Sequence, residues 1–187
     1  MLAVKVQFDE KSFKEAVFLL RAIPRAVPRV FTRAINRAVD SAAVDLKRRV
    51  GSILNVRKGD IAKALKKRRA SYSNLTGTIS AGEFRPGLIA FTGTRQTKRG
   101  VTYRIMRTTG RKLLPHGFIQ RMSSGHRGVY KRKGISRLPI SEQRGPSVWR
   151  VITNSKDLLK DATDAAGDKM AKMINQQVGY ELRKWNR

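Results

Sequence analysis

The segment GHRGVYKRKGISRLPI, residues 125–140, predicts a short strand, a basic loop and a second extended segment. Gly128-Val129-Tyr130 supplies the β-branched and aromatic residues typical of a strand, and GPSV at 145–148 predicts a turn after the extended segment. Outward from this segment, similar runs between glycines occur at 72–80, 87–92 and 101–108. Residues 71–153 are therefore predicted to form a central, mainly antiparallel sheet with long basic loops.

Two helical regions flank this central part. Apolar residues at helical spacing predict helices at about 10–22 and 24–50, separated at Ile23-Pro24 because the residue before a proline disfavours the helical conformation. The last helix is predicted to run from Ser155, as its N-cap, to Trp185. A short helix is also predicted at 60–69, where cations in the last turn suit the negative end of the helix dipole: Lys66, Lys67, Arg68 and Arg69.

The predicted fold class is α+β, with N-terminal helices, the central sheet and a long C-terminal helix. Val4, Val6 and Phe8 alternate with polar residues and add a strand or arm before the first helix. A length of 187 residues suits a single domain. Within it, residues 1–70 would form the helical N-terminal part, 71–153 the sheet and loops, and 154–187 the C-terminal helix.

The charge of the chain is its most unusual bulk property. It holds 41 lysines and arginines against 13 aspartates and glutamates, a net charge of +28. Self-repulsion at this density opposes compaction, so an anionic partner is predicted, first nucleic acid and second an acidic protein surface. Aromatic residues make up only 7% of the chain, which favours salt-sensitive contacts to phosphates over the reading of base sequence. A basic protein without such a partner is the simpler alternative.

Two like-charged stripes run along the predicted helices. Like charges three or four residues apart lie on one helix face and destabilise an isolated helix. A solvated face would explain either stripe, but the two are complementary, and we predict that they face one another within a subunit or across an interface. The stripes consist of Arg25, Arg29, Arg33 and Arg37, and of Asp157, Asp161, Asp164 and Asp168.

Two basic, glycine-flanked segments, 94–100 and 131–134, are predicted to be mobile loops that become ordered on a partner. Burying unpaired cations is costly, so the second loop should project from its domain, with 138–140 and 145–146 anchoring its base. The candidate residues for contact with DNA or a protein partner are Arg95, Lys98, Arg99, Arg127, Lys131, Arg132, Lys133 and Arg137.

Several function classes find no support in the sequence. The chain has no cysteine, so disulfides and thiolate metal sites are excluded, and His116 and His126 lack the context of a metal motif. No phosphate-binding glycine loop or nucleophile motif occurs, and capping explains the four aspartates better than a Mg²⁺ site of a nuclease does. No apolar run is long enough to cross a membrane. Residues 56–60 match a helix-turn-helix only weakly. The sequence predicts a protein that is not an enzyme and has no cofactor.

Taken together, three blocks of the chain resemble the minor tail protein Z family of long-tailed phages, the lambda-type tail completion proteins. The first block is the pattern of 125–140 followed by GPSV, which closes the central sheet in that family. The second is GTRQTKRGVT at 93–102 with HGFI at 116–119, and the third is IPRAVP at 23–28 leading into AINRA at 34–38. The resemblance covers about residues 10–155.

This resemblance implies a structural virion protein, located in the tail or neck of the particle and assembled in the host cytoplasm. Such a protein would form a homo-oligomeric ring, by analogy of six copies, at the head-proximal end of the tail. Its partners would be the tail terminator or tail tube proteins, the head connector and the end of the double-stranded phage genome, with no membrane involved. The alternative is a host protein that binds DNA or RNA without sequence preference.

Overall fold

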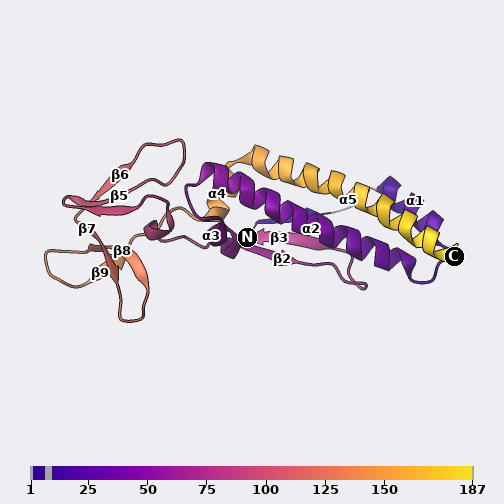
Figure 1. The fold of residues 1–187 in the computed structure, drawn as a ribbon, viewed down its shortest axis with the longest axis horizontal. Helices are drawn as coiled ribbons and strands as arrows, with labels where there is room; N and C mark the ends of the chain where they lie inside the picture. Colours follow the sequence, from indigo (N-terminus) through magenta and orange to yellow (C-terminus); the bar gives the residue numbers. More distant parts are fainter. Residues whose placement is uncertain (1, 7–9, 187) are drawn as a thin grey trace. The chain divides into compact units, whose positions relative to one another are not determined.

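The computed structural model describes residues 2–6 and 10–186, and its contacts divide the chain into two compact units (Figure 1). The helical unit comprises residues 1–46, 65–81 and 155–187, and the strand unit comprises 47–64 and 82–154. Each unit is therefore built from segments that are distant in the sequence. The predicted α+β class is confirmed, whereas the grouping of all residues into one domain stays a prediction.

In the helical unit, helices pack against a small antiparallel sheet. The helices are α1 (Glu10–Leu20), α2 (Ala26–Ile53), which contributes its residues up to 46, and α5 (Lys156–Trp185). The strands are β1 (Leu2–Val6), β2 (Leu65–Arg68) and β3 (Gly77–Ala81), in the order β1-β3-β2. The predicted N-terminal strand is thus confirmed over Leu2–Val6, and Phe8 lies outside the described residues.

The core of the helical unit follows from apolar periodicity. α5 buries a residue at nearly every fourth position, namely Leu158, Ala162, Ala166, Met170, Ile174 and Val178. α2 buries Ile35 and Val39, and strand β3 comes so close to them that a Cβ on Gly77 would lie 2.6 Å and 2.5 Å from their Cγ2 atoms. Glycine at position 77 therefore allows the sheet to approach the helix.

The helix ends differ in detail from the prediction. α2 begins at Ala26 because Arg25 adopts a left-handed backbone conformation, with φ of +58°. It ends at Ile53, beyond the break predicted at Gly51, whose backbone packs near the buried Ile61. α5 starts directly after Ser155, as predicted, but the Ser155 side chain makes no capping hydrogen bond.

Residues 66–69 do not form the end of a helix, so that prediction is wrong. Helix α3 (Lys58–Ala64) stops early and the chain continues as β2, which pairs antiparallel with β3. The Nζ of Lys67 and the Nη2 of Arg69 lie 2.6 Å and 2.7 Å from the carboxylate of Asp40 on α2. The hydrogen bond from Lys67 is the main reason that the pKa of Asp40 lies below its ordinary value. Strand pairing and these ion pairs outweigh the helical periodicity.

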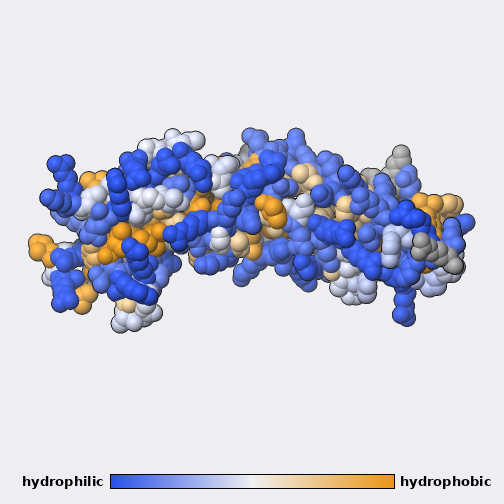
Figure 2. All heavy atoms as spheres, in the orientation of Figure 1, coloured by the Kyte–Doolittle hydropathy of each residue, from blue (hydrophilic) through white to orange (hydrophobic). Residues whose placement is uncertain are grey.

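The strand unit holds two small antiparallel sheets. One consists of β4 (Arg95–Thr97), β5 (Gly100–Tyr103) and β6 (Lys112–Pro115), and the other of β7 (Gly117–Arg121), β8 (Arg127–Arg132) and β9 (Ile140–Glu142). The antiparallel pairing is as predicted. Hydrophilic residues cover most of the visible face in Figure 2, and apolar residues gather among these strands.

Three predictions for the strand unit are wrong. Residues 87–92 contain a 3-10 turn (Leu88–Ala90) instead of a strand, because the N–H groups of Ala90 and Phe91 donate to the nearby carbonyls of Gly87 and Leu88 at 2.9 Å and 3.2 Å. The strand predicted at 101–108 ends at Tyr103. Residues 148–153, expected in the sheet region, belong instead to helix α4 (Val148–Asn154), which buries Val148, Val151 and Ile152. The weak helix-turn-helix match at 56–60, which was not a prediction, finds no support either, since α3 has only seven residues and leads into β2.

Candidate nucleic-acid interface

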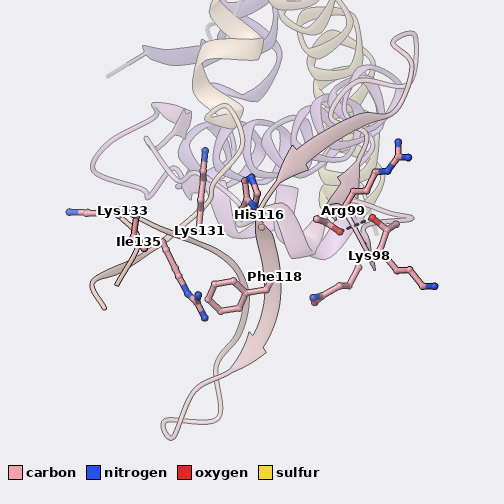
Figure 3. A pocket seen from close by; sticks show the side chains of 13 residues that line it. Lys98, Arg99, His116, Phe118, Lys131, Lys133 and Ile135 are labelled. Atoms are coloured by element: carbon pink, nitrogen blue, oxygen red, sulfur yellow. Dashed lines mark hydrogen bonds between the residues drawn. The ribbon is translucent and has the colours of Figure 1, made fainter. Parts of the chain in front are cut away.

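A concave basic pocket lies within the strand unit, with a volume of about 660 Å³. One wall is the turn between β4 and β5, and the opposite wall is the end of β8 with the loop that follows it (Figure 3). Its lining residues are Gln96, Thr97, Lys98, Arg99, Gly100, His116, Gly117, Phe118, Lys131, Arg132, Lys133, Gly134 and Ile135. Cations from both predicted basic segments thus meet around one pocket.

The first wall is a hairpin, not the mobile loop predicted at 94–100. Thr97 pairs with Gly100, and the Thr97 hydroxyl donates to the Gly100 carbonyl at 2.9 Å, so Lys98 and Arg99 form the two-residue turn. Gly100 has φ of +141°, a conformation that L side chains rarely adopt. A Cβ there would overlap the carbonyl oxygen of Leu114 on β6. The glycine therefore fixes the hairpin that presents the two cations.

The second wall is the arm formed by β8 and β9. Lys131 and Arg132 belong to β8 and pair with Ser141 and Ile140, so the loop predicted at 131–134 begins only at Lys133. The Lys133 N–H donates to the Pro139 carbonyl at 3.0 Å and closes that loop. The loop is exposed, as expected.

The predicted anchors at the base of this loop are only partly right. Leu138 is 67% exposed, whereas the Pro139 carbonyl accepts from the Lys133 N–H and the half-buried Ile140 pairs with Arg132 in the sheet. Gly145 is buried, donates its N–H to the Pro86 carbonyl at 2.8 Å, and packs against the ring of Phe91. The anchoring therefore comes from residues 139, 140 and 145, whereas the apolar side chain at 138 faces solvent.

Side-chain contacts join the two walls. The Ile119 N–H on β7 donates to Gln96 Oε1 on β4 at 2.7 Å, linking the two sheets. The ring of Phe118, at the pocket, lies 6.2 Å from that of Tyr130, and the Arg132 guanidinium lies 5.9 Å from the Phe118 centroid. These contacts connect the two sheets and place one aromatic side chain, Phe118, in the pocket lining, a residue that the sequence did not single out as functional.

The electrostatics of the pocket are one-sided. Its cationic side chains are all exposed, and in the described residues no carboxylate lies within 4 Å of any of them: Lys98, Arg99, Lys131, Arg132 and Lys133. Uncompensated cations around a concave surface attract anions, and lysine and arginine side chains commonly bind phosphate groups. The other predicted contacts, Arg95, Arg127 and Arg137, are exposed but lie outside the pocket lining.

The structural role of Glu142 was not predicted from the sequence. The carboxylate oxygens of Glu142 lie 2.9 Å from the Nε2 of His126 and 2.7 Å from the Nη2 of Arg144. Burial alone would raise the pKa of the Glu142 carboxyl, but the hydrogen bonds and charges of His126 and Arg144 bring it below its ordinary value. A signal existed, because Glu142 is one of only two acids, with Glu83, between residues 61 and 156.

Two arginines of the basic stripe have a partner that the sequence did not predict. Arg29 and Arg33 on α2 contact the carboxylate of Glu181 on α5 at 3.1 Å and 3.3 Å, and the Glu181 side chain is only 3% exposed. Arg25 and Arg37 are exposed. The four aspartates of the acidic stripe are exposed as well, and their pairing with the arginine stripe stays a prediction: Asp157, Asp161, Asp164 and Asp168.

Within the part of the chain that the structure describes, none of the helices combines the length and apolar character needed to cross a membrane.

A family model described as prophage minor tail protein Z matches residues 11–187. No curated protein and no solved structure matches the chain. The matched range contains both walls of the basic pocket and continues through α5. It therefore confirms the resemblance seen in the sequence and extends it to the C-terminal helix.

Proposed function

Because the chain belongs to the prophage minor tail protein Z family, and is thus a minor tail protein of a phage virion, we propose that it completes the tail as a ring at the head-proximal end and contacts the genome there. Its protein neighbours would be the tail terminator or tail tube and the head connector. Its role is structural, without catalysis. Family membership disfavours the alternative of a host nucleic-acid-binding protein.

The observation that carries this proposal is the basic pocket. Five exposed cations from two hairpins surround it, with no carboxylate within 4 Å of them in the described residues. A protein of net charge +28 gains most from a polyanion as its neighbour, and the packaged genome is the polyanion of a virion. Contacts to phosphates are independent of base sequence, which suits a protein that must accept any genome.

The first prediction concerns assembled particles. In the phage that encodes the chain, Lys131→Gln, Arg132→Gln and Lys133→Gln together should leave the chain folded and incorporated but should lower the fraction of particles that retain DNA several-fold. DNA retention can be measured by nuclease protection, and the position of the chain by electron microscopy of labelled particles. The matched control removes three exposed cations outside the pocket, Arg57, Lys66 and Arg68, by the same change to Gln.

Three results would contradict the proposal. A label found away from the head–tail junction would exclude the ring position. Equal DNA retention in the pocket variant, the control and the parent would exclude genome contact at the pocket. Loss of soluble chain on neutralising the pocket would instead assign these cations to folding.

The second prediction concerns the ring interface, for which we propose the complementary stripes. Since Arg29 and Arg33 already hold Glu181, we propose that aspartates of a neighbouring copy contact the exposed Arg25 and Arg37, of which Arg37 donates to the Met173 sulfur at 3.6 Å within its own chain. Arg25→Glu with Arg37→Glu should weaken self-association by about tenfold, since two exposed pairs contribute up to about 1 kcal/mol each. Sedimentation velocity measures the associated fraction.

The rescue experiment decides whether the two stripes meet. Asp164→Lys with Asp168→Lys should weaken association to a similar degree, and combining both reversals should restore it. A combined variant that associates no better than either reversal alone would rule out this pairing. Reversal of Lys58 and Arg68 to Glu, exposed cations outside the stripe, is the matched control.

A further inference from the structure

We propose that the basic pocket binds unpaired DNA, with phosphates on its cationic walls and a base against Phe118, in preference to the side of a duplex. This inference deepens the proposed function, since it specifies which form of the genome the pocket receives. It rests on the shape of the pocket, on the arrangement of its cations and on the apolar side chains between them.

The shape of the pocket favours an unpaired strand over the body of a duplex. Its volume of about 660 Å³ lies in the range of cavities that enclose small organic molecules, about 300–1,000 Å³. A DNA duplex is a convex rod whose outer surface consists of phosphates and sugars, and proteins read it by placing convex elements such as a helix into a groove about 12 Å wide. A concave pocket of this size instead suits one or two nucleotides of an unpaired strand.

The cations are placed to follow one strand across the pocket. Figure 3 shows Lys98 and Arg99 on one side of Phe118, and Lys131 and Lys133 on the other. Both groups belong to the lining of the same pocket. Phosphates of one strand can therefore contact both walls while a base between them points inward. This arrangement of a charged groove around a stacking surface is typical of sites for single strands.

The apolar side chains of the pocket supply that stacking surface. Phe118 is half-buried against Tyr130, and the Arg132 guanidinium lies 5.9 Å from the centroid of the Phe118 ring. Ile135, fully exposed to solvent, lines the same pocket. Unpaired bases stack on aromatic rings and on arginine planes and cover apolar surface. The outer surface of a duplex offers no group that would cover Phe118 and Ile135, because its bases are already stacked.

The test compares three ten-nucleotide DNA probes by fluorescence anisotropy with the full chain: an unpaired strand, the matching duplex, and an unpaired strand in which every base is absent. We expect the unpaired strand to bind about tenfold more tightly than the abasic strand, which carries the same phosphates, since stacking of one base accounts for about 1–3 kcal/mol. We expect it also to bind more tightly than the duplex. This arm needs no variant and so does not depend on whether a mutant folds.

Phe118→Leu assigns the effect to the ring. The change keeps an apolar side chain but removes the aromatic face, so binding of the unpaired strand should fall to the level of the abasic strand while binding of the duplex stays unchanged. Leu113→Ala, an exposed apolar residue outside the pocket lining, is the matched control. Thermal unfolding of each variant confirms that it is folded.

The outcomes separate this inference from the proposed function. Equal binding of the unpaired and abasic strands, or tighter binding of the duplex, overturns the inference. If duplex binding then still weakens steeply with salt, and the slope of log Kobs against log salt falls by about 3 when Lys131, Arg132 and Lys133 are changed to Gln, the proposed contact with the genome stands. Absence of binding to all three probes at low salt overturns both.

Discussion

Replacing Glu181 by Gln is expected to lower the free energy of unfolding by about 2–3 kcal/mol, although the two side chains have nearly the same shape. Glu181 on α5 is 3% exposed and is the shared partner of Arg29 and Arg33 on α2. Removing its charge leaves two cations directed at a neutral amide in a buried position. The arginine side chains are 30% and 48% exposed and can reach water, so the effect should lie below that of a completely buried pair.

Urea unfolding followed by far-UV circular dichroism measures this change. Glu10→Gln is the matched control, because Glu10 is 91% exposed and forms a surface pair with Lys14 on the same helix. It should alter stability by no more than about 0.5 kcal/mol. A similar small change for both variants would mean that the helical unit does not depend on the pair between α2 and α5.

The Glu181 contact also shows what the sequence could not provide. The stripe of arginines on α2 was evident from spacing alone, and the helices that carry Arg29 and Glu181 were both predicted. The contact between them joins residues 152 positions apart, and no local pattern indicates which of several acids will reach the stripe. The sequence suggested the four exposed aspartates at the start of α5, whereas burial selected a single glutamate near its end.

Secondary structure was predictable where a segment packs through a periodic apolar face of its own. The prediction failed where pairing with another strand determined the conformation. α1, α2 and α5 bury regular apolar faces, and the predictions for them were right to within a few residues. At Lys66–Arg69 the same sequence suits either a helix end or a strand, and pairing with β3 together with the contacts to Asp40 selected the strand. Tertiary contacts outweigh local propensity at such positions.

The candidate site was predictable in its residues but not in its shape. Excess charge between glycines identified Lys98, Arg99 and 131–133 as exposed cations. Their meeting around one pocket depends on the hydrogen bond between Gln96 and Ile119 and on hairpin geometry, neither of which has a sequence signature. Phe118 escaped notice for the same reason. A single aromatic residue in a strand is usually part of a core, and only the pocket indicates a role for it.

Gly100→Ala is expected to destabilise the chain by about 3 kcal/mol and to disrupt one wall of the pocket. The glycine has φ of +141°, which costs about 1–3 kcal/mol for any other residue. Its new Cβ would also overlap the Leu114 carbonyl oxygen and lie 3.0 Å from the Leu114 carbonyl carbon and 3.2 Å from the His116 nitrogen. These are backbone atoms of β6 and of the β6–β7 connection, so they cannot move aside without breaking the pairing of β5 with β6.

The opposite wall of the pocket provides the control for this change. Gly134 also lines the pocket, but no atom lies within 4 Å of a Cβ placed there and its φ is not positive, so Gly134→Ala should leave stability unchanged. Thermal unfolding and anisotropy with DNA should therefore separate the two variants, with Gly100→Ala losing both stability and binding. Equal behaviour would mean that the β4–β5 hairpin does not require the backbone conformation at residue 100. Because this turn positions Lys98 and Arg99 opposite Lys131, that result would show that the wall of the pocket holds its two cations without a glycine at residue 100.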